Sequence, residues 1–312
     1  MRILVTGGAG FIGSHIAQAY VDAGHDVLVL DNLSSGKQGN VPQGARFVFG
    51  DIGSDTAVEA VRTFRPEVIN HHAAQMNVRK SVSDPVFDAR ENILGSLTLL
   101  EAARKEGVRK VIFASSGGAG YGEQEDFPAD ESHPLRPVSP YGVAKVSVEL
   151  YLNYYRVQYG LAYTALRYSN VYGPRQDPHG EAGVVAIFSE RLLRGQTAIV
   201  NGDGEQTRDY VYVGDVVRSN LPALTRGDGM CINIGTGIET NVNTLFRKLR
   251  ELAGSRQEEI HGPAMPGEQV RSVIDNAMAY NELGWYPEIS LDDGLALTLA
   301  YFREKVKSSG RW

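Results

Sequence analysis

Residues 2–13 read RILVTGGAGFIG, a short apolar run that breaks into a cluster of glycines. The apolar part predicts a buried strand at Arg2–Thr6, and the segment beyond the glycines predicts a helix at Phe11–Ala23. A second predicted strand, Asp26–Leu30, ends at Asp31. Glycines between a strand and a helix allow a tight turn, and the N-terminus of the helix offers its N–H groups and its positive dipole end to a phosphate. The stretch therefore predicts a dinucleotide-binding fold.

Asp31 indicates which dinucleotide the fold prefers. An acid about 20 residues beyond the glycines accepts hydrogen bonds from an adenosine ribose and repels a 2′-phosphate. The dipeptide Asn32-Leu33 follows it and offers no cation for that phosphate. NAD is therefore favoured over NADP. Because the glycines are spaced G-x-x-G-x-x-G rather than G-x-G-x-x-G, a merely tight loop stays an alternative on the motif alone.

The pattern along the chain predicts the fold class. Strand and helix patterns alternate through the first half, which indicates right-handed βαβ units and a doubly wound parallel sheet of the Rossmann type. The further strands are expected at Arg46–Phe49, Glu67–Asn70, Lys110–Ala114 and Ala162–Tyr168, and the further helices at Ser54–Phe64, Pro85–Glu106 and Tyr141–Tyr159. After Gly173-Pro174 the pattern loosens, with helices expected at Val184–Arg194, Thr244–Leu252 and Leu291–Lys307.

This change of pattern predicts two domains of unequal size. Residues 1–173 are expected to form an NAD-binding domain, and residues 174–312 mainly a smaller mixed α/β domain for the substrate. The boundary has no clean linker, which leaves open that the chain crosses back into the first domain.

The composition of the chain limits the kinds of molecule that the protein is expected to bind. The 312 residues carry a net charge of −6, which argues against general attraction to nucleic acid or to an anionic membrane. Cys231 is the only cysteine, so an intrachain disulfide or a thiolate metal cluster is not possible. The sequence shows no apolar run of about 20 residues, and its first strand meets glycine too early for a secretory signal. We expect a soluble, cytoplasmic protein without a metal.

Tyr141 and Lys145 are four residues apart, in the sequence YGVAK. On a helix, this spacing puts both side chains on one face. A nearby ammonium favours the phenolate and lowers the pKa of a tyrosine, as a general base at neutral pH requires. A surface tyrosine with a neighbouring lysine is the alternative, and the dinucleotide fingerprint favours the base.

Taken together, several motifs resemble the extended short-chain dehydrogenase/reductase family, and within it the NAD-dependent UDP-hexose 4-epimerases. They are TGGAGFIG at 6–13, DNLSSG at 31–36, Asp51-Ile52, the Tyr141 and Lys145 pair, RYSNVYGP at 167–174 and RDYVYVGD at 208–215. The resemblance runs nearly from end to end. It is specific for the extended family and less specific for one substrate.

The resemblance implies a set of cofactor-binding residues. The pyrophosphate would be bound by Gly10, Phe11, Ile12 and Gly13, which belong to the glycine fingerprint that begins at Gly7. The adenosine ribose would be bound by Asp31, Asn32, Ser35 and Gly36, and the adenine by Asp51 and Ile52. Along the rest of the cofactor they are His72, Ala73, Ala74, Gln75, Asn92, Ser115, Tyr141, Lys145 and Tyr168. Read alone, each polar residue could equally serve local bonding.

The resemblance also implies a substrate site, with two departures from the family pattern. Asn170 and Arg208 match contacts to the sugar diphosphate. The family places a serine or threonine where Gly117 stands, so we expect Ser116 to reach in from one residue earlier, although a water or the Tyr141 and Lys145 pair alone could suffice. An equal alternative is that Ser116 only bonds backbone at the strand end.

The second departure concerns residues 265–272. Relatives often have arginine where Met265 stands, and Arg271 is expected to compensate, because a guanidinium matches phosphate oxygens. Ser272 falls near a position that bulky aromatics fill in relatives confined to plain hexoses. A serine there leaves room for an N-acetyl group.

The activity implied is the inversion of C4 of a UDP-hexose through a transient 4-keto sugar, with tightly held NAD. Dehydratases or decarboxylases of the same family would require an acid among residues 117–119, which read GGA. A reductase that releases its cofactor remains an alternative. A non-catalytic NAD sensor would have lost Tyr141 or Lys145, and both are present.

Two predicted helices carry much apolar surface, and this bears on assembly. Pro85–Glu106 carries Leu94, Leu97, Leu99 and Leu100, and Tyr141–Tyr159 carries Leu150, Tyr151, Leu152, Tyr154 and Tyr155. Family members commonly pair these helices in a dimer, so the resemblance implies a homodimer. Simple burial against the sheet is the equal alternative.

Overall fold

A seven-stranded parallel sheet forms the larger region of the molecule in a computed structural model, which describes residues 1–179, 183–264 and 269–309. Its strands follow the order β3-β2-β1-β4-β5-β6-β10. They are β1 (Arg2–Thr6), β2 (Asp26–Asp31), β3 (Arg46–Phe49), β4 (Val68–His71), β5 (Lys110–Ser116), β6 (Ala162–Tyr168) and β10 (Met230–Ile234). The predicted doubly wound Rossmann fold is confirmed. The order reverses between β1 and β4, which is where such sheets open a crevice for a ligand.

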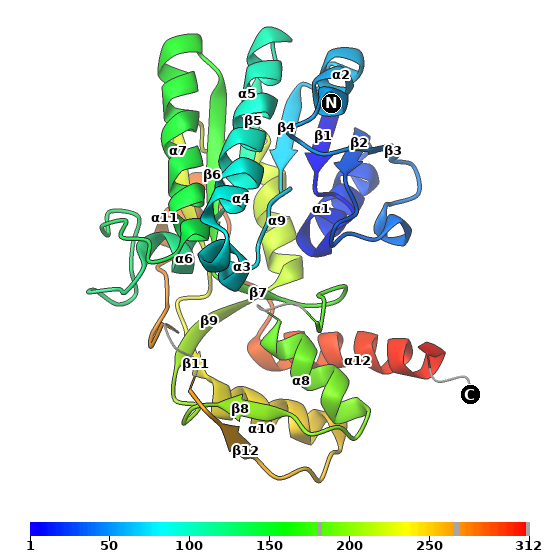
Figure 1. Cartoon of the computed structure of the whole chain (residues 1–312), viewed down its shortest axis with the longest axis vertical. Helices are drawn as coiled ribbons and strands as arrows, with labels where there is room; N and C mark the ends of the chain where they lie inside the picture. The colour runs from blue at the N-terminus through cyan, green and yellow to red at the C-terminus, as the bar shows by residue number, and fades with distance from the viewer. Residues whose placement is uncertain (180–182, 265–268, 310–312) are drawn as a thin grey trace.

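Helices cover both faces of this sheet (Figure 1). On β1, Ile3 and Val5 face one layer and Leu4 the other, as the alternation of a strand requires. The first layer contains α1 (Phe11–Asp22), α9 (Val213–Ala223) and α11 (Ala277–Leu283). The second contains α2 (Asp55–Phe64), α5 (Gly95–Lys105) and α7 (Pro140–Tyr159).

The long helix expected at Pro85–Glu106 contains a wider turn. It runs as α4 (Pro85–Ala89), a π-helical turn (Arg90–Leu94) and α5, and α3 (Val78–Ser83) precedes it. A β-carbon at Gly95 would lie 2.9 Å from Ile52 Cγ1, so the helix passes very close to the loop after β3. Ser96 Oγ also donates to the Asn92 carbonyl at 2.6 Å. Close packing and an inserted hydroxyl are common causes of such a turn.

A second region lies below the sheet in Figure 1. It contains a three-stranded sheet in the order β11-β9-β7 and a two-stranded parallel pair of β8 and β12. The strands are β7 (Asn170–Tyr172), β8 (Ile199–Asn201), β9 (Thr207–Tyr212), β11 (Glu239–Asn241) and β12 (Ile260–Gly262). Its core packs α8 (Val184–Leu193), α10 (Val242–Ala253) and α12 (Leu291–Ser309). Two short helices elsewhere are η1 (Gln38–Asn40) and α6 (Gly117–Tyr121).

The chain passes between the two regions more than once, because β10 lies beside β6 in the large sheet. A domain boundary near Gly173 stays a prediction. Among the described residues, no helix is both long enough and apolar enough to span a bilayer.

Candidate active site

The glycine turn after β1 packs closely against the loop after β4, on the other side of the crevice. Gly7 has φ +68°, and a β-carbon there would lie 2.6 Å from the backbone nitrogen of Ala73, in the loop after β4. At Gly13 a β-carbon would lie 2.3 Å from the Gly7 carbonyl oxygen. Gly10 is the N-cap of α1 and brings no side chain to its first turn. The free N–H groups of that turn fit an anionic group such as a pyrophosphate.

Asp31 connects the glycine turn to the loop after β2. Its Oδ2 accepts from the Ala9 N–H at 2.9 Å and its Oδ1 from the Leu33 N–H at 2.7 Å. A β-carbon at Gly36 would lie 2.9 Å from Asp31 Oδ1, so this loop closes on the carboxylate. Ser35 lies beside Gly36 in the same loop. The acid therefore lies where the fingerprint expects it, with both oxygens engaged by backbone donors.

Side-chain hydrogen bonds also connect the loops that follow β2 and β3. Asn32 Nδ2 donates to Asp51 Oδ2 at 2.9 Å, and Asp51 Oδ1 accepts from the Gly53 N–H at 2.8 Å. Ile52 is buried. The residues expected around an adenosine thus lie together at the ends of β2 and β3.

Two histidines stand at the end of β4: His71, its last residue, is buried, and His72, the next residue, is half-buried. His71 lies between Thr6 Oγ1 and Ser96 Oγ, at 2.8 and 2.9 Å. His72 Nε2 lies 3.1 Å from the Tyr168 hydroxyl, and the two rings stack. Burial, with a smaller contribution from the charge of Lys145, lowers the pKa of each histidine to about 3. Both rings are therefore neutral at physiological pH.

The loop after His72 is held by a clamp of three side chains. Asn92 Oδ1 accepts from the Gln75 N–H at 2.8 Å, and Asn92 Nδ2 donates to the Gln75 carbonyl at 2.9 Å. Gln75 Nε2 and Asn92 Nδ2 both donate to Asp88 Oδ1, at 2.9 and 3.0 Å. Ala73 and Ala74 lie in the segment that this clamp fixes.

Tyr141 and Lys145 lie on the first turns of α7. Ser139 caps this helix by accepting from the Gly142 N–H at 3.2 Å, and Pro140 occupies its first position. Lys145 is 4% exposed, and its Nζ donates to the Ala114 carbonyl at 2.8 Å. The same Nζ lies 5.6 Å from the centroid of the Tyr141 ring. The helix thus places an ammonium next to the phenol, at the end of β5.

The expected lowering of the Tyr141 pKa is wrong for this arrangement. Burial raises the pKa of the phenol above its usual value, and the Asp88 carboxylate raises it further. Burial also lowers the pKa of Lys145 to about 8, against the opposite influence of Asp88 and Glu149. For the phenol, desolvation is therefore the largest influence on the pKa.

The segment after β5 contains the two serines. Ser116 Oγ accepts from the Ala119 N–H at 3.4 Å, as the N-cap of α6, which is the backbone contact anticipated as its alternative role. Ser115 Oγ donates to Glu149 Oε1 of α7 at 2.6 Å. A β-carbon at Gly117 would lie 3.1 Å from Ile274 Cδ1, so a side chain at the position expected to hold a hydroxyl would require Ile274 to shift slightly.

The residues expected to bind the sugar diphosphate lie in two different places. Asn170 on β7 and Arg208 on β9 lie on adjacent strands, since Asn170 pairs with Tyr210. Arg208 Nη1 donates to the Thr207 carbonyl at 2.7 Å. Arg271 instead forms an ion pair with Glu239 at 2.6 Å, and its guanidinium lies 3.8 Å from the centroid of the Phe127 ring. Met265 lies outside the described residues.

Ser272 lies against the glycine segment after β5. It is 4% exposed, and its Oγ would lie 3.1 Å from a β-carbon at Gly118. Its backbone N–H donates to the Thr207 carbonyl, and its carbonyl accepts from the Asp209 N–H. The serine therefore connects β9 with the end of β5.

Comparison with known proteins agrees with this geometry. Residues 3–235 match the NAD dependent epimerase/dehydratase family. The chain belongs to this family. The UDP-glucose 4-epimerase of Mycolicibacterium smegmatis is 47% identical over 98% of this chain and 99% of its own. A solved structure of the Thermotoga maritima UDP-glucose 4-epimerase with UDP-glucose is 52% identical, with a TM-score of 0.96 over 98% of this chain and 100% of that one. The Thermus thermophilus UDP-glucose 4-epimerase with NAD is 46% identical, with a TM-score of 0.93 over 97% of this chain and 99% of that one.

In this member of the epimerase/dehydratase family, several buried polar residues near the site were missed by sequence reasoning. Glu149 follows Lys145 by four residues on α7 and binds Arg167 Nη2 at 2.7 Å. Asn220 donates to the Tyr168 hydroxyl at 2.9 Å and accepts from Asn70 Nδ2 at 2.9 Å. The four-residue spacing was a signal for Glu149. The two asparagines lie in apolar stretches with no motif, and their partners are distant in sequence.

Proposed function

We propose that this chain is an NAD-dependent UDP-hexose 4-epimerase, an isomerase that inverts C4 of the sugar through a transient 4-keto intermediate. One observation carries the proposal. Lys145 and Tyr141 lie together at the end of β5, and the crevice beside them opens between β1 and β4, where the glycine turn and Asp31 lie. This arrangement is a proton-transfer pair beside a dinucleotide site.

The cofactor fits the residues that the crevice offers. The uncapped first turn of α1 suits the pyrophosphate, the carboxylate of Asp31 suits a ribose, and Asn32 with Asp51 closes the adenosine side. The loop clamped by Asn92 would lie along the remainder. When bound, NAD supplies a hydride acceptor and donor at C4 and a positive charge near the phenol.

The chain itself performs the proton chemistry. Tyr141 takes the proton of the sugar 4-hydroxyl and returns it when the opposite face is reduced. Lys145, whose pKa is about 8, remains mostly an ammonium at neutral pH and stabilises the phenolate. Ser116, with an hydroxyl that already accepts a backbone bond, has its own proton to donate to the sugar.

The diphosphate side completes the site. Arg208 and Asn170, on adjacent strands of the second region, are the residues we assign to the diphosphate. Arg271 could serve only by leaving Glu239, so its contribution is the weaker one. Gly117 and Ser272 border the sugar pocket, and the small serine supports acceptance of UDP-N-acetylhexosamines as well as UDP-glucose and UDP-galactose.

Incubation with each of four UDP-sugars, without added NAD, tests the activity. UDP-glucose, UDP-galactose, UDP-GlcNAc and UDP-GalNAc are incubated separately, and the products are resolved chromatographically. We expect the 4-epimer of at least UDP-glucose and UDP-galactose, and a loss of about 10²-fold or more in kcat for Tyr141→Phe. A 4-epimer from none of the four would overturn the function. Lack of turnover of the two N-acetyl sugars alone would overturn only their acceptance.

We also propose that the protein is a cytoplasmic homodimer. The outer face of α7 exposes Leu150, Tyr151, Tyr154 and Val157, while Leu152 and Tyr155 of the same helix are buried against the sheet. Leu94 is exposed nearby on the helix that packs beside α7, whereas Leu99 and Leu100 are buried. An apolar helix face of this kind suits a second copy of itself. Light scattering tests this assembly, with Leu150→Glu expected to give monomers; a monomeric mass for the unmodified protein would contradict it.

A further inference from the structure

Asp88 is a buried acid that the mechanism above does not use. It lies on α4 and is 1% exposed. Its Oδ1 accepts from Gln75 Nε2 and Asn92 Nδ2, whereas its Oδ2 is buried without a hydrogen-bond partner among the described residues. A buried carboxylate oxygen left unpaired is costly. The clamp on the Gln75 loop uses one oxygen only, so it does not by itself account for a charged residue here.

The surroundings of Asp88 place it beside the start of α7. Together with Pro140, Val143 and Ala144, it lines an open groove of about 470 Å³ between α4 and α7. Tyr141 follows Pro140 and Lys145 follows Ala144 in sequence. The preceding helix, α3, contacts the same turn, because the Tyr141 N–H donates to Ser81 Oγ at 3.3 Å. The helices before the clamp thus pack against the turns that carry the proton-transfer pair.

We propose that Asp88 is a positioning residue for the reaction: its buried carboxylate, on the helix that packs against the first turns of α7, sets the charge state of the Tyr141 and Lys145 pair. This inference rests on the proposed function, because it concerns the same pair. It assigns Asp88 no contact with substrate. Its effect would be to set the pH range in which the phenol can lose a proton while the lysine keeps its own.

The charged groups around the pair support a specific role for Asp88. Asp88 is the charged group that acts on the Tyr141 phenol, in the direction that raises its pKa. On Lys145, Asp88 acts first and Glu149 of α7 second. From the end of β4 and the residue after it, the neutral His71 and His72 face the same ammonium. From α3, Lys80 directs its ammonium over the Phe87 ring, at 4.0 Å from the centroid.

The substitution Asp88→Asn isolates the charge. An asparagine retains an oxygen that can accept from Gln75 and Asn92, so the clamp is kept while the negative charge is removed. We expect both limbs of the pH profile of kcat/KM to move to lower pH by about one unit. Because the pKa of Lys145 is about 8 and that of Tyr141 is raised above its usual value, the lower limb reports Lys145 and the upper limb reports Tyr141. Each limb moves because its group loses a proton more readily without the neighbouring negative charge. A profile that superimposes on that of the unmodified protein would overturn the proposal.

Asp84→Asn is the matched control. Asp84 begins the same helix and caps it by accepting from the Phe87 N–H at 2.9 Å, but it is exposed. It should leave the pH profile unchanged. An equal shift in both variants would also overturn the proposal, because it would come from general charge or helix stability.

A direct titration separates this inference from the proposed function. By linkage, if Asp88 favours the ammonium of Lys145, then Lys145 must favour the carboxylate of Asp88. We expect Lys145→Met to raise the pKa of Asp88 by about one unit, measured from carboxyl carbon shifts by NMR and assigned with Asp88→Asn or, should that variant not fold, Asp88→Ser. An unchanged Asp88 titration would overturn the inference whether or not the protein epimerises a sugar.

Discussion

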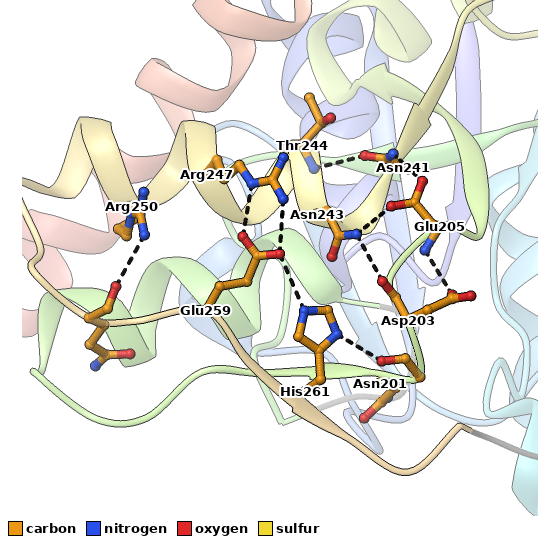
Figure 2. A network of polar contacts seen from close by, with 12 residues as sticks. Asn201, Asp203, Glu205, Asn241, Asn243, Thr244, Arg247, Arg250, Glu259 and His261 are labelled. Carbon is orange, nitrogen blue, oxygen red and sulfur yellow. Dashed lines mark hydrogen bonds and ion pairs between the residues drawn. The ribbon is translucent and has the colours of Figure 1, made fainter.

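Two polar networks of similar chemistry lie in different surroundings. Beneath the site, Arg167 joins Glu149 of α7 to Tyr121, and Tyr121 donates to Asn233; the side chains of Arg167 and Glu149 are 6% and 5% exposed. In the second region, Glu259 lies between Arg247 and His261, as Figure 2 shows. Here the side chain of Arg247 is 58% exposed.

The two networks differ in how far their side chains are exposed to solvent. In the exposed network, water can solvate each charge if its partner is removed, so little stability depends on the contact. In the buried network, removal of one partner leaves the other charge desolvated. The buried network also joins the helix that carries Tyr141 and Lys145 to β5, β6 and β10. The networks should therefore respond differently to the same kind of substitution.

Glu149→Gln should have the largest effect. It keeps the shape of the side chain but leaves the Arg167 guanidinium buried without its counter-ion. We expect a loss of about 3–5 kcal/mol in the free energy of unfolding, measured by urea denaturation. The double replacement Glu149→Leu with Arg167→Met should recover much of this loss, because no unpaired charge remains. A loss below about 1 kcal/mol for Glu149→Gln would show that water reaches this network.

Acid should weaken the sheet region through His72, a half-buried histidine. Burial, reinforced by the charge of Lys145, lowers the pKa of His72 to about 3, so the unfolded chain, with a usual histidine pKa of about 6.5, binds the proton more readily. The stability contributed by the neutral ring is complete above about pH 6.5 and falls as the pH decreases towards 3. His72→Phe should remove up to about 1.4 kcal/mol per pH unit of this dependence.

The measurement is urea denaturation at pH 7, 6 and 5. His261 provides the comparison, because its hydrogen bond to the Gly202 carbonyl and its partner Glu259 raise its pKa. Its small contribution is therefore present below about pH 6.5 and is lost as the pH rises through the folded-state pKa. His261→Phe should not reduce the acid sensitivity. The idea fails if His72→Phe and the unmodified protein lose stability in parallel.

Glu259→Gln should have the smallest effect. It breaks the ion pair with Arg247 and the contact with His261, but the partners remain in water. We expect the midpoint of thermal unfolding to change by about 1–2 °C at most, and less in high salt. Calorimetry at low and high salt measures this. A decrease of more than about 5 °C would mean that the network of Figure 2 behaves as a buried one.

The sequence allowed the dinucleotide half of the site to be predicted because its signals are local. Gly7, Gly10 and Gly13 directly follow a strand, and Asp31 ends the next one, so the backbone alone places them. The Tyr141 pKa could not be predicted in this way. It depends on burial and on Asp88, which lies 53 positions earlier in the chain and carries no motif. The ion pair of Arg271 with Glu239 likewise joins distant segments.

The return of β10 to the large sheet has a consequence for synthesis. Residues 230–234 form the strand that covers β6, so β6 stays an open edge until residues 169–229, which include the first part of the second region, have been synthesised. Exposed edges of apolar strands pair readily with other chains, and nascent chains fold from the N-terminus. A fragment that ends at residue 173 would keep this edge permanently. The large sheet is thus completed by a strand that is synthesised after the first part of the second region.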